Sequence, residues 1–187
     1  MEIKQHIRNR LAALEPRRLT NGFTREAAVL MPVMECDRQY HFLLTQRTEE
    51  VQTHKGQISF PGGMRENGET LVNTALRETF EEVGIHPDRV EILGRFHDYI
   101  SITQYRVTPF AGFVRSPFTI NPQVTEVAEV LRVPFGIFLD PGRLRTERRI
   151  VMGREEDVYY YSHGTYQVWG LTARIIKDFL EILNLEP

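Results

Sequence analysis

The sequence predicts an α/β (α+β) domain in which a mixed β-sheet is sandwiched between helices. Three observations support this class. Apolar runs of strand length recur along the chain, as at 27–33 and 41–46. Apolar residues recur at helical spacing near both ends, at 2–14 and 170–183. The 187 residues contain no repeat, low-complexity tract or interdomain linker, and this length suits one domain with a sizeable core.

The first half of the chain begins with a predicted amphipathic helix, which belongs to an N-terminal helix and loop extension over 1–24 of the single domain 1–187. Ile3, Ile7 and Leu11 lie on one face of this helix, and Pro16 follows its end. The elements expected next are strands at 27–33, 41–46 and 57–60, a polar loop at 47–56, and a helix at about 69–83 that Gly84 ends.

The second half alternates strands with turns before a final helix. The elements expected are strands at 90–96, 106–114 and 124–133, a helical turn at 134–139, and a hairpin of strands 149–153 and 158–161 around the acidic stretch 154–157. The helix at 170–183 has Leu171, Ile175, Phe179 and Ile182 on one face.

The composition limits the cellular compartments and the classes of binding partner that we expect for this chain. A net charge of −2 gives no electrostatic basis for bulk nucleic-acid binding. The single cysteine, Cys36, cannot form an internal disulfide, which favours a reducing compartment and a partly buried apolar role for its side chain. The polar N-terminus lacks a secretory pattern, and no segment reaches the ~20 apolar residues of a membrane span. We expect a soluble cytoplasmic protein with neither nucleic acid nor membrane as partner.

Three glutamates in the helix at 69–83 form the most informative local pattern. Glu78, Glu81 and Glu82 stand at i, i+3 and i+4, so their carboxylates share one helix face and repel each other. A cation would neutralise them, and hard oxygen ligands favour Mg²⁺ or Mn²⁺. The alternative is an ordinary solvated acidic face.

The neighbouring residues favour the metal interpretation. Phe60-Pro61-Gly62-Gly63 is a turn whose glycines let backbone approach a ligand. Arg77 lies four residues before Glu81 and can pair with it. The opposite side of the helix carries an apolar stripe that would pack on the protein body: Val72, Ala75, Leu76, Thr79 and Val83.

Together these positions resemble the Nudix box, G-x5-E-x7-R-E-U-x-E-E-x-G-U, where U is aliphatic. The matching residues are Gly63, Glu69, Arg77, Glu78, Glu81, Glu82, Gly84 and Ile85, and Thr79 replaces one aliphatic residue. The resemblance implies an α/β/α fold and hydrolysis of a nucleoside diphosphate linked to another group. It implies Glu78, Glu81 and Glu82 as ligands of Mg²⁺ or Mn²⁺, the Gly63 carbonyl as a further candidate, and catalytic roles for Glu81, Glu82, Arg77 and Glu69, with Arg77 orienting the glutamates.

The stretch Leu43–Gly63 is similar to the signature of the coenzyme A pyrophosphatase subgroup, L-L-T-x-R-[SA]-x3-R-x3-G-x3-F-P-G-G. It implies that substrate is bound by Arg47, Gln57, Gly62 and Gly63. Thr48 and Gln52 depart from the signature, and Gln52 brings no charge where arginine would grip phosphate bidentately. Arg47, His54 or Lys55 could supply that charge; the alternative role of Arg47 is a surface ion pair with Glu49 or Glu50.

The leading hypothesis is therefore a metal-dependent diphosphatase that splits coenzyme A or a derivative into 3′,5′-ADP and (acyl-)4′-phosphopantetheine. Alternatives are hydrolysis of ADP-ribose or another nucleoside diphosphate derivative, and a non-catalytic nucleotide-binding module. The general base is left open among Glu81, Glu82 and Glu126, and no motif supports a covalent nucleophile. The oligomeric state is also open, with a homodimer among the options.

Overall fold

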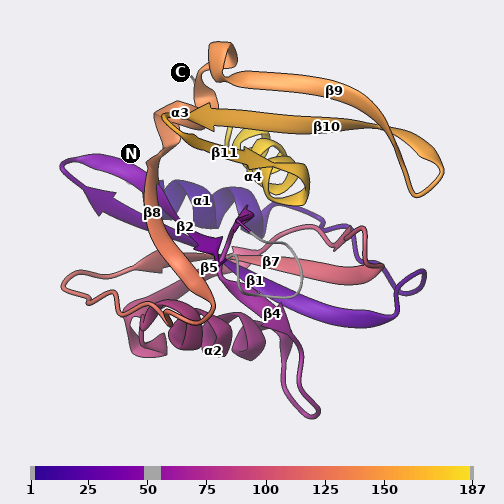
Figure 1. Cartoon of the computed structure of the whole chain (residues 1–187). Coiled ribbons are helices and arrows are strands. Elements are labelled where there is room, and N and C mark those ends of the chain that lie inside the picture. The colour runs from indigo at the N-terminus through magenta and orange to yellow at the C-terminus, as the bar shows by residue number, and fades with distance from the viewer. Residues whose placement is uncertain (1–2, 49–55, 186–187) are drawn as a thin grey trace.

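The computed structural model describes residues 3–48 and 56–185. Within them, the chain forms a large mixed sheet, a small antiparallel sheet and several helices (Figure 1). The helices are α1 (Ile3–Ala12), α2 (Leu71–Val83), α3 (Phe135–Leu139) and α4 (Gly170–Leu183), with 3-10 turns η1 (Pro87–Arg89) and η2 (Pro141–Arg143). None of the helices in this part of the chain is long and apolar enough to cross a bilayer.

The large sheet follows the order β3-β2-β1-β7-β5, with β4 also paired to β1, β6 to β7 and β8 to β2. Its strands are β1 (Arg25–Cys36), β2 (Gln39–Arg47), β3 (Ile58–Ser59), β4 (Gly62–Met64), β5 (Val90–Arg95), β6 (Tyr99–Ile100), β7 (Tyr105–Val114) and β8 (Val127–Pro134). The β1–β7 pair is parallel and the other pairs are antiparallel, so the sheet is mixed as predicted.

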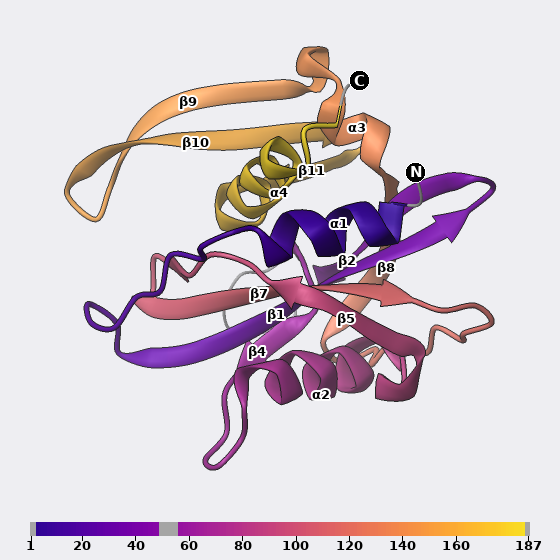
Figure 2. The same ribbon diagram turned by 180° about the vertical axis from the view of Figure 1, so that it is seen from behind.

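Helices cover both faces of the large sheet. Helix α2 lies on one face, whereas α1 and α4 lie on the other (Figures 1 and 2). Beyond α4 lies the small sheet, in the order β11-β10-β9, made of β9 (Leu144–Val151), β10 (Arg154–His163) and β11 (Tyr166–Trp169). This arrangement confirms the predicted sheet sandwiched between helices.

Strand β1 is buried on both faces because hydrophobic clusters lie on either side of it. Ala28 and Leu30 belong to the cluster beneath α2. Met31 and Val33 belong to the cluster shared with α1 and α4. The alternation places successive residues on opposite faces of the pleated strand, which explains why its sequence is almost continuously apolar.

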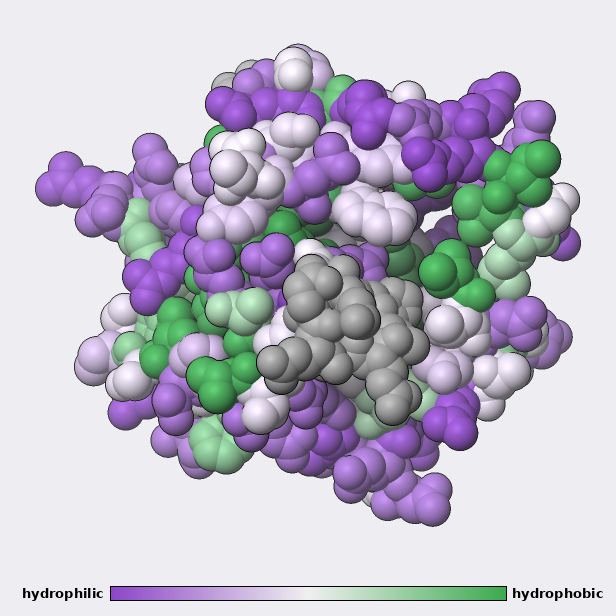
Figure 3. Space-filling view, viewed as in Figure 1, coloured by the Kyte–Doolittle hydropathy of each residue, from purple (hydrophilic) through white to green (hydrophobic). Residues whose placement is uncertain are grey.

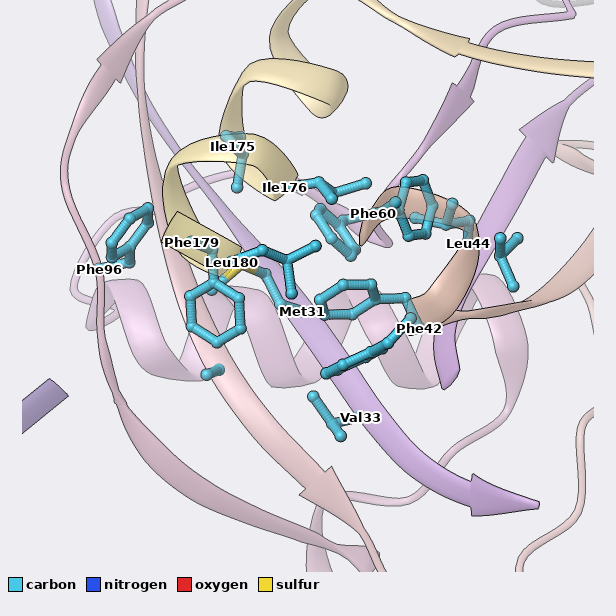
Figure 4. Close-up of a cluster of buried hydrophobic side chains, with 14 of the residues drawn as sticks. Met31, Val33, Phe42, Leu44, Phe60, Phe96, Ile175, Ile176, Phe179 and Leu180 are labelled. Atoms are coloured by element: carbon cyan, nitrogen blue, oxygen red, sulfur yellow. The ribbon is translucent and has the colours of Figure 1, made fainter. Parts of the chain in front are cut away.

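Aromatic rings fill the larger cluster (Figure 4). Phe42 of β2 meets Phe60 edge-on at a ring-centroid distance of 5.4 Å and Phe179 of α4 at 6.1 Å. Such tilted contacts suit the quadrupoles of the rings and add to the apolar area that they bury. Phe60 opens the Pro-Gly-Gly turn, so the core fixes the start of that turn.

The structure departs from the sequence prediction at the hairpin. The expected turn at 154–157 is wrong: these acidic residues lie in β10, where they pair with 148–151 of β9. The turn is instead at Met152 and Gly153, whose φ angles are 51° and 78°. Two consecutive left-handed residues make the tight connection that hairpins favour. Opposing arginines on β9 let the acidic stretch stay extended, as in the Arg148–Asp157 ion pair.

Smaller differences concern strand ends and short strands. β8 begins at Val127, three residues later than predicted, because 124–126 form a turn. β4, β6 and β11 were not expected, and only two to four residues make up each. Most of the expected loop at 47–56 lies outside the described residues.

The N-terminal extension is fixed to the sheet by a fully buried carboxylate. Asp98 lies between β5 and β6, and its side chain accepts hydrogen bonds from Leu19 N at 2.9 Å, Arg95 Nη2 at 2.7 Å and Thr108 Oγ1 at 2.7 Å. The Asp98 backbone N–H also donates to Arg17 O at 2.9 Å. A buried charge with several donors is stable only while all its partners remain.

We predict that Asp98→Ala lowers the free energy of unfolding by about 3–5 kcal/mol, because it leaves Arg95 and a backbone N–H without their acceptor. Urea denaturation followed by circular dichroism measures this. Asp88→Ala is the matched control: this carboxylate is 65 % exposed and should cost no more than about 0.5 kcal/mol. Equal midpoints for the two variants would contradict the role of Asp98.

Candidate active site

Two glycines of β4 allow the sheet and α2 to approach closely. A Cβ atom on Gly62 would lie 2.4 Å from the carbonyl oxygen of Ala28, and one on Gly63 would lie 2.5 Å from the Glu78 carboxylate. Real Cβ atoms do not tolerate such distances, so a side chain here would push β4 away from β1 or from Glu78. The Pro-Gly-Gly turn thus brings backbone directly against the glutamate cluster.

Helix α2 has well-defined ends. Thr70 caps its N-terminus by accepting from Asn73 N at 3.3 Å. Gly84 ends it in the left-handed conformation, with φ of 75°, and donates to Phe80 O at 2.8 Å. Thr79 is fully buried, and its hydroxyl donates to Ala75 O at 2.6 Å. The replacement of an aliphatic residue by Thr79 therefore leaves no unpaired polar group in the core.

Arg77 joins most of the motif through five hydrogen bonds. Its Nε and Nη2 donate to the two carboxylate oxygens of Glu69, at 3.0 and 3.2 Å. Its Nη1 donates to Glu78 Oε1 at 2.8 Å and to Glu81 Oε2 at 2.9 Å, and its Nη2 also donates to Met64 O at 3.1 Å. The expected contacts of Arg77 with Glu69 and Glu81 are present. One guanidinium therefore connects β4, α2 and the loop between them, which contains Glu69.

Glu69 is held in its charged form. The hydrogen bonds from Arg77 lower its pKa to about 2, helped by the Thr74 hydroxyl, which donates at 2.7 Å, and by the backbone N–H of Glu66; partial burial opposes this shift. The sequence did not reveal the Thr74 contact, because a threonine inside a helix gives no sign of the carboxylate it will meet.

The pKa values of Glu78 and Glu82 are raised, whereas that of Glu69 is lowered. Burial raises the pKa of Glu82 to about 8, against the attraction of Arg47, whose Nη1 lies 3.9 Å from Glu82 Oε1, and a hydrogen bond from Gly62 N at 3.3 Å. Burial also raises the pKa of Glu78, against the hydrogen bond from Arg77. For both carboxylates, burial outweighs the stabilisation that the neighbouring arginine provides.

Glu126 adds a further negative charge to this region. It raises the pKa of both Glu78 and Glu82 through like-charge repulsion. Its loop is fixed on two sides: Gln123 N donates to Glu82 O at 2.9 Å, and Thr48 N donates to Glu126 O at 3.0 Å. The chain thus places an exposed carboxylate beside the buried ones.

The donor set suits a hard divalent cation. Glu78 and Glu82 offer partly buried carboxylate oxygens next to backbone without side chains at Gly63. In the described part of the chain, no three Asp, Glu, His or Cys side chains already converge on one point. Glu81 is half-exposed and turned toward Arg77, and it would have to turn back to join the other two.

Arg47 ends β2 beside this cluster, and its Nε is buried with no hydrogen-bond partner in the described structure. The Gln57 carbonyl accepts from Arg47 N at 3.0 Å, and the Gln57 side chain is partly exposed. The other candidates for the missing positive charge lie outside the described residues: His54 and Lys55. So do Gln52 and the two suggested ion-pair partners of Arg47, Glu49 and Glu50.

Several side chains outside the motif make structural contacts. His97 Nδ1 accepts from Arg17 N at 2.9 Å and so holds the N-terminal extension. Tyr161 packs edge-on against Phe138, and Tyr160 stacks on Trp169. Cys36 is a free, partly buried thiol.

Comparison with known proteins identifies the family of the motif. The family model of the NUDIX domain matches residues 24–156. The uncharacterized Nudix hydrolase NudL of Photorhabdus laumondii is 36 % identical over 170 residues, covering 89 % of this chain and 88 % of the relative. That of Citrobacter koseri is 35 % identical over 183 residues, covering 96 % and 94 %.

Solved structures share the fold. A MutT/nudix family protein from Enterococcus faecalis has a TM-score of 0.57 at 16 % identity, covering 98 % of this chain and 75 % of that protein. An Ap4A hydrolase from C. elegans has a TM-score of 0.52 at 19 % identity, covering 60 % and 82 %. At such identities the likeness concerns the fold alone.

The Glu69–Arg77 pair predicts a pH-dependent contribution to stability. The pKa of Glu69 falls from 4.5 to about 2 on folding, so its stabilisation is complete above pH 4.5 and is lost as the pH falls towards 2. Glu69→Gln should cost about 1–3 kcal/mol at pH 7, since solvent near Arg77 screens part of the attraction. Urea denaturation of both proteins between pH 7 and 2 measures this. A difference that stays constant over that range would contradict the pairing.

Proposed function

Because the chain belongs to the Nudix hydrolase family, we propose that it hydrolyses the diphosphate bond of coenzyme A or a coenzyme A derivative. One contact carries this proposal: Arg47 Nη1, from the stretch similar to the coenzyme A signature, lies 3.9 Å from Glu82 of the Nudix box. A phosphate bound by Arg47 would therefore lie beside the carboxylates. The products would be 3′,5′-ADP and 4′-phosphopantetheine or its acyl form, as water adds across the P–O–P bond.

The cofactor in this proposal is Mg²⁺ or Mn²⁺, held by Glu78, Glu81 and Glu82, with the Gly63 carbonyl as a further candidate ligand. When bound, the cation screens the diphosphate charge and lowers the pKa of a bound water. The environment of Glu78 and Glu82 supports this donor set, because burial and neighbouring carboxylates penalise their ionised forms and a bound cation would relieve that penalty.

Each protein group has a separate task. Arg77 orients Glu78 and Glu81 through its Nη1 and is itself fixed by both oxygens of Glu69. Arg47 offers a planar guanidinium suited to bidentate phosphate binding, and its Nε, which has no partner among the described residues, leaves hydrogen-bonding capacity for a ligand or water. Gln57 and the Gly62–Gly63 backbone line the substrate side of the turn in this proposal.

Three groups are candidates for the general base that takes a proton from the attacking water: Glu81, Glu82 and Glu126. Glu126 is exposed, and its backbone is held at the site from both α2 and β2. Its carboxylate is therefore free to take a proton from a water at the site, whereas Glu81 and Glu82 are also needed as metal ligands.

The second candidate function is hydrolysis of ADP-ribose or another nucleoside diphosphate derivative. Gln52 favours it, because a neutral side chain stands where the coenzyme A signature has arginine. A non-catalytic nucleotide-binding module is disfavoured, since every glutamate of the box is intact.

A substrate panel tests the proposal. We expect purified protein with Mg²⁺ or Mn²⁺ to hydrolyse coenzyme A or its thioesters faster than ADP-ribose, NADH or dinucleoside polyphosphates, and to lose activity when EDTA removes the cation. Product formation measured by chromatography checks this. Turnover of another panel member without turnover of coenzyme A or a thioester would overturn the substrate and keep the enzyme class.

Glu81→Gln and Glu82→Gln test the metal ligands. Each removes one negative charge while keeping the shape, so we expect kcat to fall by about 10²-fold or more in each variant. Steady-state kinetics over a range of Mg²⁺ concentrations measures the loss. Glu35→Gln, at an exposed position at the far end of β1, is the control and should retain wild-type rates. Near-normal kcat in both motif variants would refute this assignment.

A further inference from the structure

A cavity lies beneath the β9–β10 hairpin. Its volume is about 670 Å³, within the range of small-molecule sites. Its walls are the hairpin, the segment that contains β6 and the loop after it, and the start of α4. Figure 3 shows the molecule hollowed between the hairpin and the body, with apolar residues near the hollow. In the described structure, no residue of the Nudix box lines it.

Most of the large exposed apolar side chains in the described structure line this cavity. Six large hydrophobic residues are exposed in the described structure, and four of them line the cavity: Ile102, Ile150, Met152 and Trp169. Single exposed apolar residues are ordinary, but their concentration at a hollow marks a binding surface. The cavity is therefore suited to an apolar group.

The charged groups of the lining offer little to an ionic ligand. Three guanidinium groups balance three carboxyl groups: Arg17, Arg149, Arg174, Asp98, Glu156 and Asp157. The arginines are already engaged. Arg17 donates to the Asp98 carbonyl at 3.3 and 3.4 Å, Arg174 to the Asp157 carbonyl at 3.0 Å, and Arg149 to the Glu147 carboxylate at 2.8 Å. A neutral ligand group fits this lining better than a phosphate.

The aromatic rings are engaged as well. Tyr160 and Trp169 stack on each other, with centroids 6.1 Å apart and planes 9° from parallel. The guanidinium of Arg145 lies 4.2 Å from the centroid of the Tyr160 ring. A purine would have to compete with these contacts, whereas the flexible side chain of Met152 can adapt to an aliphatic chain and Ile150 offers it exposed apolar surface.

The register of the large sheet relates the cavity to the active site. Tyr99, which lines the cavity, pairs with Val107; Val107 pairs with Ala27, and Ala27 pairs with Met64, next to Gly63. Three strand spacings make this row about 14 Å long. A 4′-phosphopantetheine arm has a backbone equal to about four residues, and so reaches about 14 Å when extended.

We propose that the cavity beneath the hairpin binds the acyl chain of an acyl-coenzyme A, and that the enzyme therefore prefers acylated to free coenzyme A. This inference rests on the proposed function. The diphosphate lies at Arg47 and the glutamates, the pantetheine arm covers the distance from there to the hairpin, and the aliphatic chain enters between Ile102, Ile150 and Met152.

The kinetic test compares free coenzyme A with its acetyl, butyryl and octanoyl thioesters. We expect kcat/KM to rise with chain length, by up to roughly fourfold for each methylene that becomes buried. In the double variant Ile150→Ser/Met152→Ser, the ratio of octanoyl to free coenzyme A should fall towards one. Val124→Ser is the matched control, because Val124 is 73 % exposed and lies outside the cavity lining. This variant should keep the wild-type ratio.

A binding test does not depend on turnover. Trp169 is the single tryptophan of the chain and lines the cavity, so its fluorescence reports occupancy. With EDTA present, octanoyl-coenzyme A should shift its emission to the blue, free coenzyme A should not, and the double variant should lose the response.

The outcomes separate the two proposals. Turnover of coenzyme A with rates independent of chain length and no change in emission would overturn the cavity assignment while the proposed function stands. An emission change that follows protein concentration alone would make a second copy of the chain the occupant and would also overturn it. Turnover of free coenzyme A without turnover of its thioesters would also overturn the cavity assignment, whereas failure to hydrolyse both coenzyme A and its thioesters would overturn the proposed function.

Discussion

Arg77 donates five hydrogen bonds, and the geometry of the motif depends on where they go. Its guanidinium is about one-quarter exposed and connects Glu69 before α2, Glu78 and Glu81 on α2, and the carbonyl of Met64 in β4. The rigid fork of a guanidinium holds several acceptors at fixed angles. Lysine would keep the charge here but would lose the planar contacts with both oxygens of Glu69.

The site also depends on the contrast between its carboxylates. Glu69 is stabilised as an anion by Arg77, whereas Glu78 and Glu82 are partly desolvated and the Arg47 guanidinium faces Glu82 at the longer distance of 3.9 Å. The glycines at 62 and 63 contribute to this burial, because they allow β4 to lie directly against the cluster. The stability that the large hydrophobic clusters provide keeps these poorly compensated acids in place.

The sequence predicted much of this structure, and its failures have physical causes. The helix at 170–183 agrees with the structure at both ends, and Gly84 ends α2 as expected, since periodicity and capping are local signals. The hairpin turn was misplaced, because an acidic stretch resembles a turn until the arginines of β9 pair with it. The buried role of Asp98 could not be predicted, since its partners Leu19, Arg95 and Thr108 come together only in the fold. At the site, spacing predicted the contacts of Arg77, but the raised pKa of Glu82 comes from burial that no spacing encodes.

The position of α1 has a consequence for biosynthesis. Ile3, Ile7 and Leu11 bury their side chains in the cluster that contains Phe179 and Leu183 of α4, and His6 Nε2 lies 2.6 Å from the carbonyl oxygen of Leu183. The ribosome makes α1 long before α4, so the apolar face of α1 stays without its partner while the sheet is synthesised. Long-range contacts of this kind form late and leave apolar surface open to aggregation or to chaperones. Helix α4 therefore completes the hydrophobic core, because it supplies the residues against which α1 packs.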